Sequence, residues 1–429
     1  MLFKNIKMLD RDFSIVENAF VGVEGSKIEY IGTERPEKDY GRVYSGEGKL
    51  LMPGFYNCHG HSPMTLMRGY GENMALQEWL TKRIFPFEDK LTGEAVYWGT
   101  LLAMAESLRF GIVSTSDMYY FIDDMVRGVS DAGAKANISR AIVNFDDKDL
   151  WQLPSMKEMK RTFEAYNGYE NGKIKMDVSI HGEYTSTEAA VREVSQYGKE
   201  VGAIMHIHVS ETKQEHEQCK ERRNGLTPVQ YFARCGAFET PAVAAHCVHI
   251  EGDDYEILRE KGVTVSVNPV SNLKLSSGIC DVAKLFENNV KVAIGTDSVA
   301  SNNNLNFFEE MKTLAIMSKV KANDPKVVTP VETLRAATLE GAMAQGRRDC
   351  GQIICGNRAD LIVVDISKPN MVPVHNMANN LVYSASGSDV VLTMADGNVL
   401  YENGEYTSID IEKTIFEADK CTKDILGRL

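Results

Sequence analysis

The sequence has no CxxC pair among its eight cysteines, and it has no long apolar run. Without closely spaced cysteines, neither a zinc ribbon nor a disulfide framework is indicated, and we expect the protein in a reducing cytoplasm. The N-terminus, MLFKNIKMLDRDFS, lacks the apolar core of a signal peptide, and no stretch approaches the length and apolarity of a membrane span. These absences favour a globular protein that does not use a membrane.

Positive charge is also scarce. The 429 residues include 47 Lys and Arg against 60 Asp and Glu, which gives a formal net charge of −13. A field of this sign opposes non-specific binding to nucleic acid and to acidic membranes, so we expect neither as a partner. A small anionic ligand is not excluded, because a local site can oppose the overall field.

The spacing of apolar residues changes twice along the chain. The first fifty residues alternate short apolar runs with turn signals, which is typical of a small β unit. From about Leu50, eight apolar runs alternate with helical segments: LLMPGFYN, GIVSTSDMY, ANISRAIVN, KMDVSIHG, GAIMHIHVS, PAVAAHCVH, VTVSVNPVS and KVAIGTDS. After about Cys350 the β pattern returns, with hairpin signals in ADGNVLYENGEY. We therefore expect an α/β fold, with a (β/α)8 TIM barrel over residues 55–350 and one small β domain built from residues 1–54 and 351–429.

Histidine is scarce, with nine residues, yet several histidines stand where the expected strands end. The polar endings are His59-Gly60-His61 on the first run, His208 on the fifth, His246 on the sixth and Asp297 on the eighth. In a barrel these ends form the active face, and alternate strand residues share a side, so His59 and His61 point at one spot. Three imidazoles and a carboxylate suit a divalent metal such as zinc. His206 competes with His208 as a ligand, but it lies one layer deeper, so we interpret it as a core or supporting residue.

Several stretches resemble the amidohydrolase superfamily and, within it, the aminohydrolase branch that contains the 5-methylthioadenosine/S-adenosylhomocysteine deaminases. They are PGFYNCHGHSPMTLMRG, LQEWLTKRIFPFEDKLT, IHVSET, AAHCVH, NPVSNLKLSSGI and GTDSVASNNNLNFFEEM. The resemblance covers nearly the whole chain and implies that the small β domain is a split β-sandwich. It implies hydrolytic deamination of a small-molecule nucleoside to the inosine analogue and ammonia, with 5-methylthioadenosine, S-adenosylhomocysteine, 5′-deoxyadenosine or adenosine as the substrate.

The resemblance also implies the roles of individual residues. It implies metal ligation by His59, His61, His208 and Asp297, and catalytic work by Glu211, His246 and Asp297. Members with two metals usually carry a modified lysine at the end of the fourth strand, where this chain offers His181 in VSIHGEYT. We therefore expect one divalent metal ion, Zn²⁺ before Fe²⁺ or Mn²⁺. The metal would lower the pKa of water toward about 7, and a protonated Glu211 would donate to the purine ring.

Substrate contacts are expected on the loop after the first strand and beyond. Trp79, within the expected lid of residues 62–92, either covers the purine or the 5′ substituent or packs in the core. The resemblance implies that Glu88 binds the ribose hydroxyls and that His181 contacts the nucleoside. It also implies that Arg140 meets a carboxylate on the 5′ substituent.

The stretch after Arg140 departs from relatives that carry a second arginine there. DDKDLWQLPSMKEMK contains no arginine, and only Lys148, Lys157 and Lys160 could replace it. A lysine lacks the bidentate fork of arginine, so an uncharged 5′-modified adenosine is favoured over a substrate with a homocysteine carboxylate.

Two other functions stay open. The same chemistry could act on guanine, cytosine, a pterin or a triazine, but only a ribose-bearing substrate needs both Glu88 and His181. A non-catalytic barrel scaffold is the alternative from another class, and it is disfavoured because all the expected ligands and catalytic residues are present. The oligomeric state is also open, and a homo-oligomer is compatible with the sequence.

Overall fold

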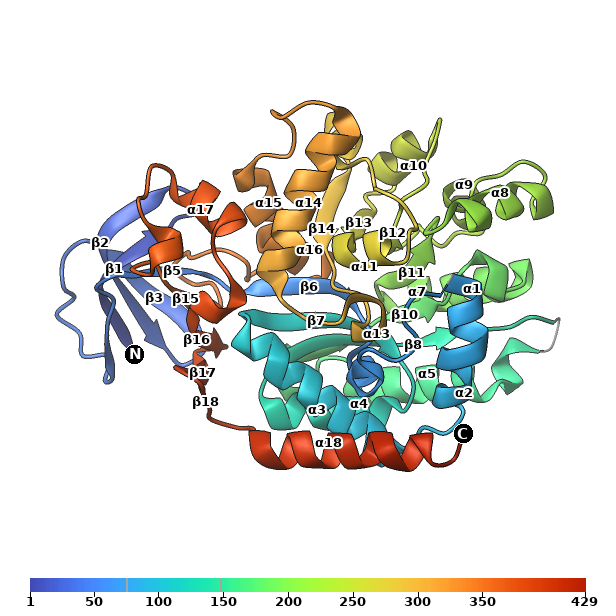
Figure 1. Cartoon of the computed structure of the whole chain (residues 1–429), viewed down its shortest axis with the longest axis horizontal. Coiled ribbons are helices and arrows are strands. Elements are labelled where there is room, and N and C mark those ends of the chain that lie inside the picture. The colour runs from blue at the N-terminus through green and yellow to red at the C-terminus, as the bar shows by residue number, and fades with distance from the viewer. Residues whose placement is uncertain (75, 147–148) are drawn as a thin grey trace.

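The computed structural model describes residues 1–74, 76–146 and 149–429, which form a barrel with a smaller sheet beside it (Figure 1). Lys148 lies outside the described residues. Within them, no helix has both the length and the apolarity needed to cross a membrane.

The barrel consists of parallel strands paired in the order β14-β13-β12-β11-β10-β8-β7-β6, with β9 paired to β8. The strands are β6 (Phe55–Gly60), β7 (Ile112–Tyr119), β8 (Lys135–Ile142), β9 (Ile174–Met176), β10 (Val178–Ile180), β11 (Met205–Val209), β12 (Ala242–His246), β13 (Thr264–Val267) and β14 (Lys291–Ile294). The ring closes where the backbone N–H groups of Thr296 and Asp297 donate to the carbonyl oxygen of His59, at 3.1 and 2.9 Å. The expected (β/α)8 barrel is confirmed.

Helices cover the outside of this barrel, so its strands are buried on both faces. The segments after β6, β7, β8 and β10 are η1 (Ser62–Met67), α1 (Leu76–Trp79), η2 (Leu80–Ile84), α2 (Phe85–Glu88), α3 (Gly93–Arg109), α4 (Ile122–Ala132), η3 (Leu150–Gln152), α5 (Pro154–Tyr166), α6 (Tyr169–Gly172), η4 (Glu183–Thr185) and α7 (Glu188–Val201). Those after β11 to β14 are α8 (Lys213–Arg222), α9 (Pro228–Arg234), α10 (Asp254–Glu260), α11 (Pro269–Lys274), α12 (Val282–Glu287), α13 (Val299–Asn302), α14 (Phe307–Ala322), α15 (Pro330–Ala337) and α16 (Leu339–Ala344). In α4 the buried Ile122, Met125, Val126 and Val129 recur at helical spacing, and Gly133 ends the helix at φ 72°.

The second sheet joins both ends of the chain, in the order β18-β17-β16-β15-β5-β1-β2-β3, with β4 paired to β1. Its strands are β1 (Leu2–Leu9), β2 (Ile15–Glu24), β3 (Lys27–Gly32), β4 (Val43–Ser45), β5 (Lys49–Pro53), β15 (Leu361–Asp365), β16 (Val390–Ala395), β17 (Asn398–Glu402) and β18 (Glu405–Tyr406), with η5 (Pro369–Met371), α17 (Met377–Tyr383) and η6 (Gly387–Asp389) between β15 and β16. This is the expected β-sandwich domain from both termini. The exact domain boundaries, at 54/55 and 350/351, stay a prediction.

One expected strand, LLMPGFYN, is two strands in different sheets. The chain leaves β5 of the sandwich and enters β6 of the barrel at Gly54, where a Cβ atom would lie 2.5 Å from Val113. The close approach of the Val113 side chain to this point of the backbone therefore favours glycine.

Alternate residues of β5 and β15 pack into different hydrophobic cores. Leu51 and Val363 belong to the core of the sandwich, whereas Leu50 and Met52 belong to the core that includes the barrel. This alternation follows from the period of two along a strand, and it packs the two domains against each other through apolar side chains.

A buried ion-pair network also joins the domains. The Nζ atom of Lys135, at the start of β8, lies 2.6 Å from carboxylate oxygens of both Asp360 and Asp396, and the hydroxyl of Tyr56 donates to Asp360 at 2.5 Å. All four side chains are buried. A buried cation of this kind holds together two carboxylates that would otherwise repel each other.

Replacing Lys135 with Met is therefore expected to destabilise the protein by about 3–5 kcal/mol, because the buried Asp360 loses its counter-ion and Asp396 keeps only Arg358, whose Nη1 lies 3.0 Å from its Oδ1. The free energy of unfolding from denaturant titration measures the loss. The exposed Lys157→Met serves as the control and should change stability by less than about 0.5 kcal/mol. Equal stability of the two variants would contradict a structural role for this network.

The C-terminal helix α18 (Ile411–Leu426) leaves the sandwich and lies along α3 of the barrel (Figure 1). The hydroxyl of Thr422 donates to the carbonyl of Leu66 at 3.3 Å, and Arg428 donates to the carbonyl of Lys90 at 2.9 Å. The last helix thus contacts the segment after β6, which carries the expected substrate contacts.

Candidate metal centre and active site

The histidines at the strand ends converge. The ring nitrogens of His59, His61 and His208 lie within 4.8 Å of one another, and so do ligand atoms of His59, His246 and Asp297. His59 and His61 project to one side because they are alternate residues at the end of β6, while His208 and His246 lie on the adjacent strands β11 and β12. The structure brings together the residues that the sequence analysis selected, and their roles as metal ligands stay a prediction.

Three of these imidazoles are held by their Nδ1 atoms. Nδ1 of His61 donates to the carbonyl of Met118 at 2.6 Å, and Nδ1 of His208 donates to the carbonyl of His181 at 2.7 Å. Nδ1 of His59 lies 2.9 Å from Nε2 of His206, and a proton on Nδ1 of His59 makes His206 the acceptor. In a neutral ring with its proton on Nδ1, Nε2 keeps a lone pair that faces the cluster, and Nε2 of His59 is buried with no hydrogen-bond partner. An orphaned nitrogen in such a cluster fits a metal ligand.

Burial keeps two of the metal-facing imidazoles neutral. It lowers the pKa of His59 to about 3 and the pKa of His208 well below its usual value. A neutral imidazole is the form that binds a metal, so at neutral pH these two rings need not lose a proton first. For His61, the effect of burial is outweighed by Asp297, which raises the pKa to about 8, so this ring loses a proton when it binds a metal at neutral pH.

Asp297 faces the cluster from the end of β14. Its Oδ1 atom lies 3.5 Å from Nε2 of His59 and 3.3 Å from Nε2 of His61, and its Oδ2 accepts from the hydroxyls of Ser271 and Ser301 at 2.6 and 3.2 Å. The backbone of Asp297 has a φ of 59°, a left-handed conformation that few non-glycine residues adopt. This geometry aims one carboxylate oxygen at the histidines and fixes the other.

His246 is held differently from the other histidines. Its Nδ1 accepts from the side-chain amides of Asn268 and Asn272, at 3.1 and 2.8 Å. Since Nδ1 is the acceptor, the proton of a neutral ring lies on Nε2, which faces the site. His246 is therefore arranged to donate a hydrogen bond at the position where the other three offer a lone pair.

Glu211 lies in the loop after β11 and is buried. Its Oε2 is 3.9 Å from Nε2 of His246, and its Oε1 accepts from the hydroxyl of Ser277 at 3.3 Å. Burial, with the charge of Asp297, raises the pKa of Glu211 to about 8. The carboxyl group is therefore protonated at neutral pH and can act as an acid.

Glu215 holds the loop that carries Glu211. Its two carboxylate oxygens accept from the backbone N–H groups of Ser210 and Glu211, at 3.1 and 2.7 Å. Sequence reasoning missed Glu215, although the T-x-x-E spacing from Thr212 is a helix-capping signal. It also missed Asn268, Ser271, Asn272 and Ser277, which all lie within the quoted stretch NPVSNLKLSSGI.

An inner pocket of about 90 Å³ is lined by His61, His208, His246, Asp297 and Glu211, and also by Trp79, Glu88 and His181. His181 contributes a partly buried ring, whose Nδ1 lies 3.2 Å from the hydroxyl of Thr185. Arg140 is not among the lining residues of this pocket; it lines an adjoining side pocket that shares Phe85, Glu88 and Tyr120 with it.

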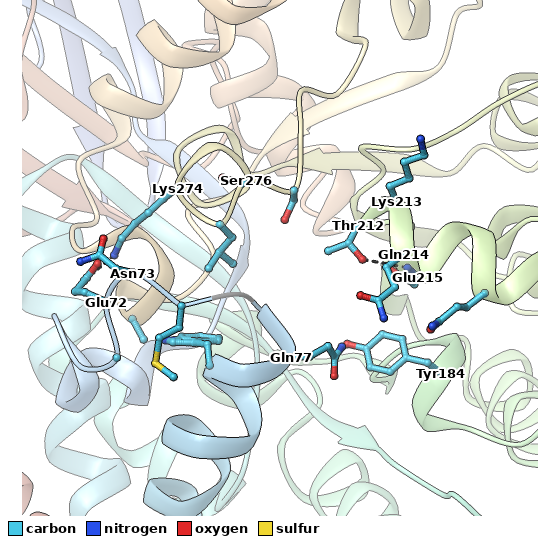
Figure 2. Close-up of a pocket in the computed structure, with 17 residues that line it drawn as sticks. Glu72, Asn73, Gln77, Tyr184, Thr212, Lys213, Gln214, Glu215, Lys274 and Ser276 are labelled. Carbon is cyan, nitrogen blue, oxygen red and sulfur yellow. Dashed lines mark hydrogen bonds and ion pairs between the residues drawn. The ribbon is translucent and has the colours of Figure 1, made fainter.

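An outer hollow of about 860 Å³ lies above the inner pocket, and Figure 2 shows its polar lining, which includes Gln77, Gln214, Lys213 and Lys274. The inner pocket and the outer hollow share Trp79, Tyr184 and Leu275. The sequence did not decide whether Trp79 covers the substrate or packs in the core. Its side chain is buried and lies at the boundary between the two spaces.

Comparison with known proteins agrees with the fold. The model of the amidohydrolase family matches residues 50–400. A 5-methylthioadenosine/S-adenosylhomocysteine deaminase of Caldanaerobacter subterraneus subsp. tengcongensis is 39% identical over 428 residues, covering 99% of this chain and 98% of the relative. A 5′-deoxyadenosine deaminase of Methanosarcina mazei is 39% identical over 431 residues, covering 100% and 99%. An adenosine deaminase of Xanthomonas campestris, solved with bound zinc, superposes with a TM-score of 0.92 at 29% identity, covering 99% of this chain and 98% of the other. The chain belongs to the amidohydrolase family.

Proposed function

We propose that this protein is a metal-dependent hydrolase that deaminates adenosine-type nucleosides to the inosine analogue and ammonia. The observation that carries the proposal is the buried carboxyl group of Glu211, whose pKa is raised, beside a cluster of histidines and Asp297 whose ligand atoms converge. The full-length relatives named as deaminases of 5-methylthioadenosine, S-adenosylhomocysteine and 5′-deoxyadenosine support the same reaction.

The metal in this proposal is one divalent ion, zinc, held by His59, His61, His208 and Asp297, with Fe²⁺ and Mn²⁺ as alternatives. The zinc in the related adenosine deaminase supports this choice. A bridging lysine at the end of the fourth strand would favour two metals, but β10 ends at Ile180 and the next residue is His181. When bound, the ion would supply Lewis acidity that brings the pKa of water toward about 7.

Three side chains of this protein move or hold protons in the proposed reaction. Asp297 accepts a proton from the attacking water. Glu211 donates its proton to the purine nitrogen beside the reacting carbon, which makes that carbon more electrophilic. The proton held by Asp297 then passes to the departing amino group, which leaves as ammonia, and the ionised Glu211 takes the hydroxyl proton of the adduct, so that both carboxyl groups regain their starting forms. Nε2–H of His246 donates to the oxygen of the tetrahedral adduct.

Two side chains of the inner pocket support a nucleoside over a free base. Burial raises the pKa of Glu88 to about 7, and the hydroxyl of Tyr120 donates to its Oε2 at 3.4 Å. We assign Glu88 to the ribose hydroxyls and His181 to a second nucleoside contact, with Trp79 covering the bound molecule.

Ammonia release across a substrate panel tests the proposal. The panel contains adenosine, 5′-deoxyadenosine, 5-methylthioadenosine, S-adenosylhomocysteine, guanine and cytosine. We expect turnover of the adenosine-type nucleosides at rates at least about 100-fold above those of the free bases, because buried ribose partners are left unpaired by a free base. Preferred turnover of guanine or cytosine would overturn the substrate assignment.

The activity should fall as the pH rises above about 8, the raised pKa of Glu211. The pKa of this acid is raised, so its protonated form persists through neutral pH and is lost above that value. The pH profile of kcat/KM measures this fall in activity. The hydroxyl of Ser277 donates to Glu211 and favours its ionised form, so in Ser277→Ala the fall should begin at a higher pH. A profile that stays flat well above pH 8 would contradict an acid role for Glu211.

A further inference from the structure

The side pocket next to the inner pocket has a volume of about 460 Å³ and an unusual balance of charge. Its lining includes one cation, Arg140, and three acidic residues, Glu88, Asp89 and Glu158. It shares Phe85, Glu88 and Tyr120 with the inner pocket, so a molecule bound at the histidine cluster can extend into it past Glu88.

Among the described residues that line this side pocket, the only cation is already paired. Nε of Arg140 donates to Oε2 of Glu158 at 2.9 Å, and Nη1 donates to the carbonyl of Ala141 at 2.8 Å. The guanidinium also stacks on the ring of Tyr120, with its central carbon 4.6 Å from the ring centroid. Arg140 is thus held on three sides.

Glu158 is fixed from its other oxygen as well. Its Oε1 accepts from the backbone N–H of Ile122 at 3.2 Å, and its side chain is mostly buried, at 25% exposure. An arriving carboxylate would have to displace this anchored glutamate from Arg140 while it also faced Asp89. The pocket therefore neutralises its own cation and leaves an excess of negative charge.

We propose that this side pocket selects nucleosides with a neutral or cationic 5′ substituent and discriminates against a 5′ carboxylate, with Glu158 as the specificity-determining residue. The inference rests on the proposed function, because it places the ribose at Glu88. It gives Arg140 a different role from the one that the resemblance implies: Arg140 holds Glu158 in place and does not bind a carboxylate of the substrate. Lys157, whose Nζ donates to Gln152, is not among the lining residues.

A charge series of similar size tests the proposal. The substrates are 5′-deoxyadenosine, 5′-amino-5′-deoxyadenosine and adenosine 5′-carboxylic acid, which are neutral, cationic and anionic at neutral pH. The expected kcat/KM for the carboxylate is at least about tenfold below that for 5′-deoxyadenosine, and the amine should equal or exceed it, because like charges brought together are costly.

The Glu158→Gln variant makes the test specific. Its amide oxygen can still accept from Ile122, but the charge is gone and Arg140 is released. In each protein, kcat/KM for the carboxylate and for the amine is divided by kcat/KM for 5′-deoxyadenosine. From the unchanged protein to Glu158→Gln, the ratio for the carboxylate should rise about tenfold and the ratio for the amine should fall. Glu164→Gln, an exposed residue on the same helix, is the control and should leave both ratios unchanged.

The outcomes separate the two levels of the proposal. If none of the three nucleosides releases ammonia, the proposed function fails. If they are turned over but the carboxylate matches 5′-deoxyadenosine, or if Glu158→Gln leaves the ratios unchanged, the function stands and the role of Glu158 is overturned.

Discussion

Glu211→Gln is expected to lower kcat by at least about 10²–10⁴-fold, the usual contribution of general acid–base catalysis, while metal binding stays nearly intact. Glutamine keeps the shape of the buried side chain and can still face Ser277, but it cannot exchange a proton. Substrate affinity should change little, since the lost interaction is made in the transition state. Steady-state kinetics and metal analysis of the purified variant measure both quantities.

A rival role for Glu211 is to orient the metal ligands without moving protons. Loss of such support typically weakens metal affinity by about 10–100-fold, and added zinc would then restore turnover. In our account added zinc has no effect on the variant. Near-native kcat at saturating zinc would therefore refute the proton transfer assigned to Glu211.

His208→Ala is expected to remove most of the bound metal and nearly all activity. Its Nδ1 is held by the carbonyl of His181, so the ring has one function left, which is to present Nε2 to the cluster. Removal of this nitrogen leaves an incomplete set of ligands, and activity should be lost with the metal. Metal content after dialysis, measured by atomic emission, reports the loss directly.

His206→Ala is the matched comparison, because His206 is the neighbouring histidine that the sequence could not fully separate from a ligand. In the structure its Nε2 contacts Nδ1 of His59, and it is not among the residues whose ligand atoms converge within 4.8 Å of one another. We expect this variant to lose about 10–100-fold in metal affinity and to recover activity when zinc is added. If His206→Ala lost its metal irreversibly and His208→Ala kept it, the two assignments would be reversed.

The barrel and the meeting of His59, His61, His208, His246 and Asp297 were predictable from the sequence because each depends on a simple rule. Strand ends meet at one face of a barrel, and alternate residues share a side. The composite sandwich was predictable from the return of strand and hairpin signals near the C-terminus. The split of LLMPGFYN at Gly54 was not, because two consecutive strands without a turn have the same apolar pattern as one.

The partners of the site residues could not be predicted from spacing alone. Asn268, Asn272 and Ser271 reach His246 and Asp297 from a helix that begins after another strand, and such contacts depend on tertiary packing. The pairing of Arg140 with Glu158 is of the same kind, since the two residues lie on a strand and on the helix that follows it. A sequence motif identifies the residue type at a position. The neighbours of that residue in the folded structure determine whether its charge is available to a ligand.

The most direct test of a hydrolytic deaminase follows the oxygen and the nitrogen of the reaction together. The zinc-loaded protein is incubated with 5′-deoxyadenosine in water enriched in heavy oxygen, and the product is analysed by mass spectrometry alongside the ammonia released. We predict one labelled oxygen in the 6-oxo group of 5′-deoxyinosine for each ammonia, and none after the metal is removed by a chelator. Ammonia release without label in the purine, or full activity of the metal-free protein, would contradict the account.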